Sequence, residues 1–295
     1  MAFRRLGTLR SSRVLRRDRW AWRSAPALGP RYTSPGRVVG REDSDVKDYR
    51  REPFERMVIL GESTVQGGPW VSDPSHYFAD IVADLIDTAQ DAPFHYVNSG
   101  IGANAISPRS PGYADSAKPS AMERYRDDVI DHDPDLFVFC YGLNDMRAGM
   151  DVDEFIDDAR TILADVKAAC DPVLVLTTIY HMTGWRSFPP FDRGTPDLNA
   201  TYNERIAVLA DEMGGLLADV WRAQGEADWL INPDGVHANR IGNMLIAHEV
   251  FATLARNCSC LTNATFAADM ETDWTRNTTA SRASAGDPYR KTWGS

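Results

Sequence analysis

Asp234 and His237 lie three residues apart in the 295-residue sequence, in a segment that reads Asn-Pro-Asp-Gly-Val-His. At this spacing a single turn can hold the carboxylate against the imidazole, where it fixes the tautomer of the ring and stabilises the imidazolium. Such a histidine can accept the proton of a serine hydroxyl and activate it as a nucleophile. Taken alone, the segment is as typical of an ordinary Asp-Gly turn that leads into a helix.

Ser63 is the serine best placed for this chemistry. It follows the apolar residues 57–60 and Gly61, a pattern that indicates a short buried strand ending in a tight turn. A side chain in such a turn lies at the carboxyl edge of a sheet, where open α/β folds bind their ligands. The alternative is a serine that caps the following helix, which is the commoner role of such a turn.

Two further segments carry groups that can stabilise negative charge. Asn144 follows a hydrophobic strand pattern in Gly-Leu-Asn-Asp, and its carboxamide can donate a hydrogen bond to a developing oxyanion. As an alternative, this asparagine caps a helix. Residues 98–103, Asn-Ser-Gly-Ile-Gly-Ala, end another strand pattern. Their free backbone N–H groups can form an anion-binding concavity, or the segment is simply a glycine-containing turn.

Strand and helix patterns alternate along the chain. This alternation predicts a parallel sheet with helices on both faces. The turns after the first three strands and the loop before the last helix then share one edge, and those segments carry the candidate residues. The expected strands are residues 57–60, 94–98, 135–141, 172–179 and 216–220, and the expected helices are 75–89, 122–131, 152–169, 198–213 and 239–254.

Together the four segments resemble the SGNH (GDSL-type) hydrolase superfamily over about residues 56–256. They occur in one order: Gly-x-Ser at the first strand, Asn-x-Gly-x-Gly at the second, Gly-x-Asn-Asp at the third, and Asp-x-x-His before the last helix. The resemblance implies a three-layer α/β/α flavodoxin-like sandwich with a central, mostly parallel five-stranded sheet. In the implied site, Ser63 is the nucleophile, His237 is the base and Asp234 is the acid that orients it. The implied oxyanion donors are the N–H of Ser63, an N–H from Gly102 or Ala103, and the side chain of Asn144.

Two residues depart from the family pattern. Glu62 stands where the family usually has Asp, and its extra methylene changes how the carboxylate can brace the turn. Ala103 stands where the family usually has the glycine that donates to the oxyanion. Because alanine resists positive φ, either Gly102 supplies the donor or Ala103 tolerates the local geometry.

The implied activity is that of a serine esterase that cleaves a carboxylic ester through an acyl-enzyme, with no cofactor and no metal. Acyl transfer to another acceptor and a non-catalytic carbohydrate- or ligand-binding module are the alternatives. We expect the insertions 106–119 and 180–196 to wall the pocket, with His181 and Trp185 as candidate substrate contacts. The resemblance does not decide between small-molecule, carbohydrate and lipid esters.

Charge and composition set the expected boundaries of the folded part. Residues 1–56 carry 15 basic and 7 acidic side chains, whereas the remainder has a net charge of -18, which disfavours nucleic acid or anionic lipid as a partner. We expect an Arg-rich disordered tail over 1–53, the hydrolase domain over 54–256 and a second tail over 257–295. The Arg-rich head also resembles a transit peptide or a nucleic-acid-binding arm. The apolar runs fall short of the ~20 residues of a membrane span. The Arg-rich head has no apolar h-region and so no recognisable secretion signal, which makes the cytoplasm the expected location, with organellar targeting as the alternative. The oligomeric state is undetermined.

Overall fold

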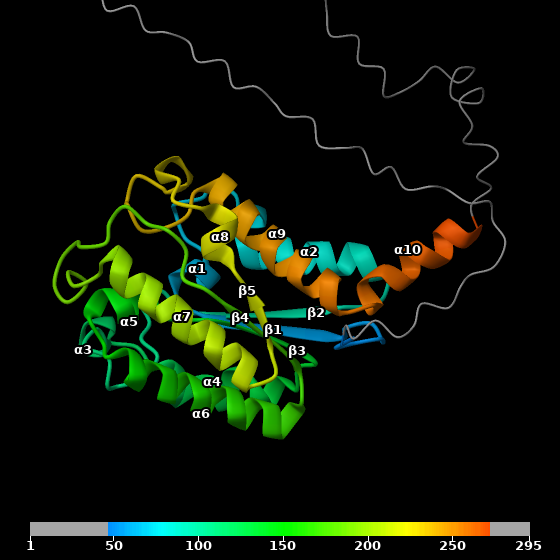
Figure 1. The fold of residues 1–295 in the computed structure, drawn as a ribbon, viewed down its shortest axis with the longest axis horizontal. Coiled ribbons are helices and arrows are strands. Elements are labelled where there is room, and N and C mark those ends of the chain that lie inside the picture. The colour runs from blue at the N-terminus through cyan, green and yellow to red at the C-terminus, as the bar shows by residue number, and fades with distance from the viewer. Residues whose placement is uncertain (1–46, 272–295) are drawn as a thin grey trace, which may run out of the picture. The chain divides into compact units, whose positions relative to one another are not determined.

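A five-stranded parallel sheet forms the centre of the computed structural model, which describes residues 47–271 (Figure 1). The strand order is β2-β1-β3-β4-β5, and all neighbouring strands run parallel. This arrangement confirms the predicted α/β/α sandwich. The strands are β1 (Arg56–Gly61), β2 (His95–Gly100), β3 (Leu136–Cys140), β4 (Val173–Thr177) and β5 (Leu216–Ala218).

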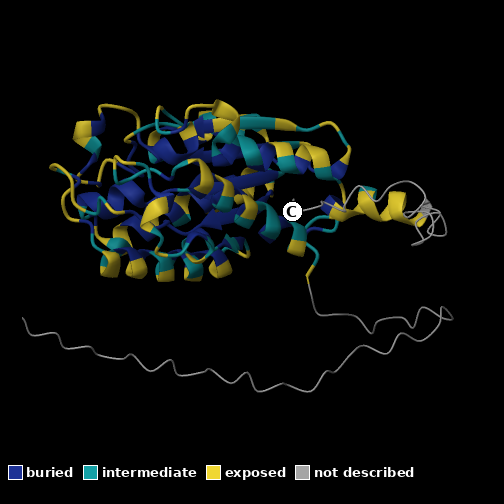
Figure 2. Cartoon of the chain, turned by 90° about the horizontal axis from the view of Figure 1, so that it is seen from above, coloured by how far each residue is buried: buried dark blue, intermediate teal, exposed yellow. Residues whose placement is uncertain are grey.

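The central strands are buried because they are continuous apolar runs. β1, β3 and β4 are buried over nearly their whole length, as expected for a parallel sheet that is covered on both faces. Figure 2 shows the same distribution, with buried residues on the strands and on the inner sides of the helices, and exposed residues on their outer sides.

Helices cover both faces of the sheet. The α-helices of the described residues are α1 (Ser63–Gln66), α2 (Phe78–Gln90), α3 (Tyr113–Ser116), α4 (Ala121–Asp128), α5 (Leu143–Ala148), α6 (Val152–Cys170), α7 (Pro196–Glu212), α8 (Val220–Gln224), α9 (Arg240–Asn257) and α10 (Cys260–Glu271). Short 3-10 helices span Pro74–His76, Ile130–His132 and Asp228–Leu230. α2, α8 and α9 pack together on one face, and α4, α6 and α7 pack on the other (Figure 1).

The carboxyl ends of the strands gather the predicted site segments at one edge. α1 follows β1 and α5 follows β3, and both helices lie at the same end of the sheet (Figure 1). Gly100, the last residue of β2, allows α1 to approach closely, since a Cβ at this position would lie 2.1 Å from Gln66 N. Asn98 fixes this contact by donating from Nδ2 to Val65 O (2.8 Å).

The folded part extends beyond the expected boundaries at both ends. Instead of a tail from residue 257, the chain continues from α9 into α10, and residues 47–53 pack against the start of α10. Asp48 accepts hydrogen bonds from Ser259 N–H (3.0 Å) and Oγ–H (2.7 Å), and Cys258, Cys260 and Leu261 are buried. The rest of the expected tails, residues 1–46 and 272–295, lies outside the described residues.

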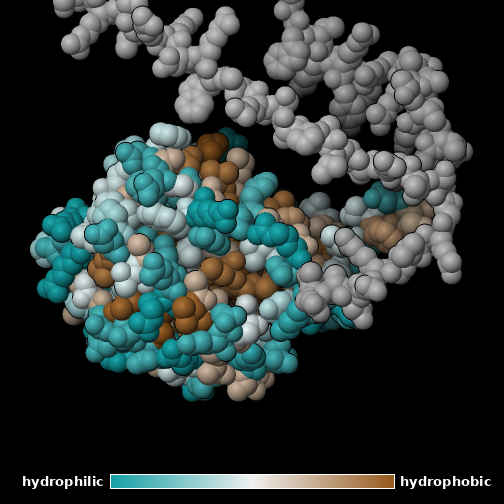
Figure 3. All heavy atoms as spheres, in the orientation of Figure 1, coloured by the Kyte–Doolittle hydropathy of each residue, from teal (hydrophilic) through white to brown (hydrophobic). Residues whose placement is uncertain are grey.

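The face of the molecule seen in Figure 3 is largely polar. Figure 3 shows hydrophilic residues over most of one face, interrupted by separate apolar patches. Within residues 47–271 no helix is both long enough and apolar enough to cross a membrane.

Candidate active site

Ser63, His237 and Asp234 meet at the carboxyl edge of the sheet. Ser63 is the first residue of α1, directly after β1, and its Oγ lies 2.8 Å from His237 Nε2. His237 Nδ1 lies 2.7 Å from Asp234 Oδ2. In this geometry Nδ1–H donates to the carboxylate, and the unprotonated Nε2 accepts from the serine hydroxyl. The structure therefore brings together the three residues that the sequence predicts for the triad.

Local backbone bonds hold the aspartate against the histidine. Asp234 Oδ1 accepts hydrogen bonds from the backbone N–H groups of Val236 (2.8 Å) and His237 (2.9 Å). Asn232 N–H donates to His237 O (2.7 Å). Gly235, between them, has a φ of +78°, which glycine adopts without steric cost. The loop thus closes on itself and presents both side chains to Ser63.

The electrostatics of the pair suit a general base. Burial lowers the pKa of His237 below its ordinary value, and it outweighs the opposing effect of Asp234. Partial burial alone would raise the pKa of Asp234, but hydrogen bonds from the backbone of His237 and Val236 lower it overall. The imidazole is therefore neutral and the carboxylate ionised at neutral pH, which is the state that accepts a proton from Ser63.

Trp70 covers one face of the His237 imidazole. Its ring is stacked on the His237 ring, with centroids 3.6 Å apart and planes 6° from parallel. Asn232 Nδ2 donates to Trp70 O (2.9 Å), so the loop that carries His237 also holds the tryptophan. Sequence reasoning missed this residue, because Gly-Gly-Pro-Trp after the nucleophile turn matches no motif.

The two predicted sources of oxyanion donors lie in the same cleft as Ser63. Asn144 is a buried residue of the first turn of α5, and its Nδ2 donates to Asn104 O (3.1 Å). Gly102 N–H donates to Gln66 Oε1 at 2.6 Å. Ala103 has the left-handed φ of +54° that alanine rarely adopts, and no described residue accepts a hydrogen bond from its N–H.

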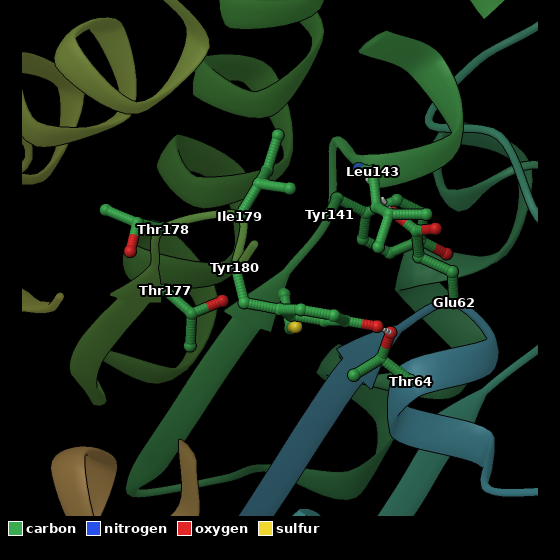
Figure 4. Close-up of a pocket in the computed structure, with 9 residues that line it drawn as sticks. Glu62, Thr64, Tyr141, Leu143, Thr177, Thr178, Ile179 and Tyr180 are labelled. Carbon is green, nitrogen blue, oxygen red and sulfur yellow. Dashed lines mark hydrogen bonds between the residues drawn. The ribbon is translucent and has the colours of Figure 1, made fainter. Parts of the chain in front are cut away.

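Glu62 links the end of β1 to the start of α5 by hydrogen bonds. Its side chain is 1% exposed. Oε1 accepts from the N–H groups of Gly142 (3.0 Å) and Leu143 (2.9 Å), and Oε2 accepts from Asn144 N–H (3.2 Å). Burial, together with the nearby Asp145, raises the pKa of Glu62 well above its usual range. Figure 4 shows Glu62 beside Leu143 in a cavity of about 10 Å³, a volume that matches about one water molecule.

A cleft of about 600 Å³ opens at the triad, which is large enough for a small-molecule substrate. Of the two expected insertions, 180–196 contributes Ser187, Phe188 and Phe191 to its lining, whereas 106–119 contributes no residue. The other lining residues are Ser63, Gln66, Gly67, Gly68, Pro69, Trp70, Gly102, Ala103, Asn144, Arg147, Asp234, Val236 and His237.

His181 and Trp185 do not line this cleft. His181 Nε2 lies 2.8 Å from Asp228 Oδ1, and its ring packs against those of Trp185 and Trp221. The sequence predicted His181 and Trp185 as pocket contacts, whereas the aromatic residues of the insertion that line the cleft are Phe188 and Phe191. An irregular segment has no periodicity that fixes the direction of each side chain, so its composition could not distinguish between them. Within residues 47–271 there is no group of three or more His, Cys, Asp or Glu side chains that could hold a metal ion.

Comparisons with known proteins agree with the fold. Among solved structures, the acetylxylan esterase Axe2 from Geobacillus stearothermophilus is 20% identical, with a TM-score of 0.51 over 68% of this chain and 94% of that chain. A lipase/acylhydrolase from Enterococcus faecalis is 16% identical, with a TM-score of 0.53 over 67% and 94% of the two chains. TesA is 15% identical, with a TM-score of 0.53 over 68% and 98%. At these identities the likeness shows the fold.

The comparison with curated proteins finds no match. The model of the GDSL-like Lipase/Acylhydrolase family, however, matches residues 59–245. This range spans more than half of the chain and contains all four motif segments, from Ser63 to His237. The chain therefore belongs to the GDSL-like lipase/acylhydrolase family, as its motifs predict.

Proposed function

We propose that this protein is a serine esterase that hydrolyses a carboxylic ester through an acyl-enzyme intermediate. The observation that carries the proposal is the chain of hydrogen bonds from Ser63 through His237 to Asp234, with distances of 2.8 and 2.7 Å. Membership of the acylhydrolase family supports the same reaction class. So does the cleft of about 600 Å³, which gives an ester access to Ser63.

Each proton transfer in the reaction uses His237 Nε2. The imidazole takes the Ser63 proton while Oγ attacks the carbonyl carbon of the ester. The bond to the alcohol then breaks, and the alcohol leaves with the proton from Nε2. Water, deprotonated by the same nitrogen, attacks the acyl-enzyme. The bond between the acyl carbon and Ser63 Oγ then breaks, Oγ recovers the proton from Nε2, and the acid is released. Asp234 stays ionised throughout and stabilises the imidazolium.

For the tetrahedral intermediate we assign three donors: Ser63 N–H, Ala103 N–H and Asn144 Nδ2. Ala103 is favoured over Gly102 because the Gly102 N–H already donates to Gln66 Oε1 at 2.6 Å. The left-handed φ of Ala103 supports this choice, since here an alanine adopts the conformation that usually calls for glycine.

Replacement of the nucleophile tests the proposal. Wild-type protein is expected to hydrolyse p-nitrophenyl acetate and to be labelled once by a fluorophosphonate, and Ser63→Ala is expected to lose both properties while its circular dichroism is unchanged. The exposed Ser75 provides the matched control, because Ser75→Ala should retain full activity. Turnover by purified Ser63→Ala would refute the mechanism. A wild-type protein that neither turns over esters nor is labelled would favour a ligand-binding module.

A further inference from the structure

Arg147 is a buried cation in the same cleft as the nucleophile. It lines the cleft with Ser63 and Asn144, yet it is only 5% exposed. Within the described residues its guanidinium donates one hydrogen bond, from Nη2 to Ser187 Oγ (2.6 Å). Its buried Nε has no hydrogen-bond partner there, and no carboxylate of residues 47–271 forms an ion pair with it.

The acidic side chains that act electrostatically on Arg147 are already engaged. Asp234 accepts from His237 and from the backbone of its own loop. Glu62 accepts from three backbone N–H groups at the start of α5. Burial lowers the pKa of Arg147, but a guanidinium remains protonated in proteins. A buried cation without an anionic partner is costly, so the position calls for an anion that the described residues do not supply.

Neighbouring residues fix the guanidinium in place. Arg147 lies three residues after Asn144 on α5, so both side chains share one face of the helix. The Phe191 ring lies 5.6 Å from the guanidinium carbon. A Cβ on Gly194 would lie 2.4 Å from Trp185 O and 3.1 Å from Arg147 Cγ, so the backbone of the insertion packs closely against the arginine stem at this glycine. Asn144 and Arg147 are therefore held on the same short helix.

We infer that Arg147 binds a carboxylate carried by the substrate, so that the preferred substrates are esters bearing one negative charge. This inference rests on the proposed esterase function. Among the described residues, Arg147 is the one Lys or Arg in the cleft lining, which fits a single charge better than a phosphate monoester of about -1.5 to -2. The planar guanidinium also matches a carboxylate in geometry.

Pairs of esters that differ only in charge test the inference. For the acyl side, monoethyl succinate, glutarate and adipate are each compared with the corresponding carboxamide, which has the same shape and no charge. For the alcohol side, 4-acetoxybutanoate is compared with 4-acetoxybutanamide. Wild-type protein is expected to favour the carboxylate in at least one pair by about 10- to 100-fold in kcat/KM, as for a hydrogen bond between two charged groups.

Substitutions in the cleft identify the side chain that causes the preference for the carboxylate ester. Arg147→Met should reduce the preference to near unity, and Arg147→Lys should retain part of it. Ser187→Ala removes the one hydrogen bond but leaves the charge, and should keep the preference. Arg186, an exposed residue of the same insertion, provides the control, because Arg186→Met should behave as wild type. Fluorophosphonate labelling of Ser63 shows that each variant has a folded site.

The outcomes separate this inference from the proposed function. Equal rates for carboxylate and carboxamide in every pair would overturn the role of Arg147 and leave the esterase intact. The role of Arg147 is also overturned if Arg147→Met slows both members of a pair equally, since that result indicates a purely structural arginine. A protein that hydrolyses none of these esters and no p-nitrophenyl ester would instead refute the esterase.

Discussion

Asn144 of α5 is the side-chain donor of the proposed oxyanion hole. One Nδ2 hydrogen is used by Asn104 O at 3.1 Å, which leaves the other for the developing oxyanion. Loss of one such donor typically costs about 10²–10³ in kcat. We expect Asn144→Ala to lose that much in kcat on p-nitrophenyl acetate, with little change in KM. A loss of less than about threefold would remove Asn144 from the oxyanion hole.

Glu62 determines where that carboxamide lies, because it accepts the N–H groups of Gly142, Leu143 and Asn144. In Glu62→Gln the amide oxygen can still accept two of them, but its NH₂ group then faces the third. A buried donor without an acceptor costs about 1–3 kcal/mol. We expect urea unfolding to show a loss of that size, with a fall in kcat because Asn144 shifts.

Glu52 offers a matched control for this substitution. It is exposed, and its side chain makes no hydrogen bond within the described residues. Glu52→Gln should therefore leave both the unfolding midpoint and kcat unchanged. Unchanged stability in Glu62→Gln would mean that the carboxylate does not brace α5.

At the scale of elements, the loop after α1 sets the environment of His237, the proposed general base. Trp70 covers one face of the His237 ring, and burial is the main cause that lowers the pKa of this histidine. Only the neutral imidazole accepts a proton, so activity is lost as pH falls through that pKa. The acid limb of kcat/KM is therefore expected below pH ~6.5, the ordinary histidine value.

Removal of the Trp70 indole should shift the acid limb of the kcat/KM profile. In Trp70→Ala water reaches the ring, so we expect the limb to move up towards pH ~6.5 and kcat/KM at pH 6 to fall. Trp70→Phe should lie in between. Trp229, which is 79% exposed, provides the control, since Trp229→Ala should leave the pH profile unchanged. A limb that does not move in Trp70→Ala would contradict this account.

The sequence could predict most of the secondary-structure elements, but it could not predict many of the single side chains that line the cleft. Buried strands are readable because each is an uninterrupted apolar run, and a parallel sheet then brings their carboxyl ends to one edge. Short-range geometry also predicted the pair Asp234 and His237. The wall residues Trp70 and Phe191 were not predictable, because they lie on irregular loops whose paths depend on tertiary packing. α10 was missed since only its first turn is buried, which leaves no apolar stripe.

At the scale of the whole molecule, the two ends of the folded part close the edge of the sheet opposite the active site. Arg50 Nη2 lies 2.6 Å from Asp135 Oδ2, just before β3 begins. Tyr49 N–H donates to Asn257 O (2.8 Å), at the end of α9. These contacts involve the amino ends of the strands, whereas the triad lies at the carboxyl ends. Changes there should alter stability without altering catalysis.

Substitution of Asp48 can test whether stability at this edge is independent of catalysis at the other. Partial burial would raise the pKa of Asp48, but hydrogen bonds from Ser259 lower it overall. A lowered pKa in the folded state stabilises the fold above the unfolded pKa of ~3.9, and this contribution is lost as pH falls through the folded value. At pH 7 we expect Asp48→Ala to reduce the free energy of unfolding by about 1–2 kcal/mol, the scale of hydrogen bonds to a charged group at a partly exposed site.

The difference between Asp48→Ala and wild type should shrink at pH 3, where the carboxyl group is largely protonated in the unfolded chain and the charge no longer favours the fold. Asp87→Ala removes an exposed carboxylate from α2. This control should neither lower the free energy of unfolding at pH 7 nor change its difference from wild type at pH 3. Because Asp48 lies at the far edge of the sheet, its variant should retain wild-type kcat below the unfolding transition. A fall in kcat in fully folded Asp48→Ala would show that the two edges are coupled, and that the closure at the chain ends also positions the triad.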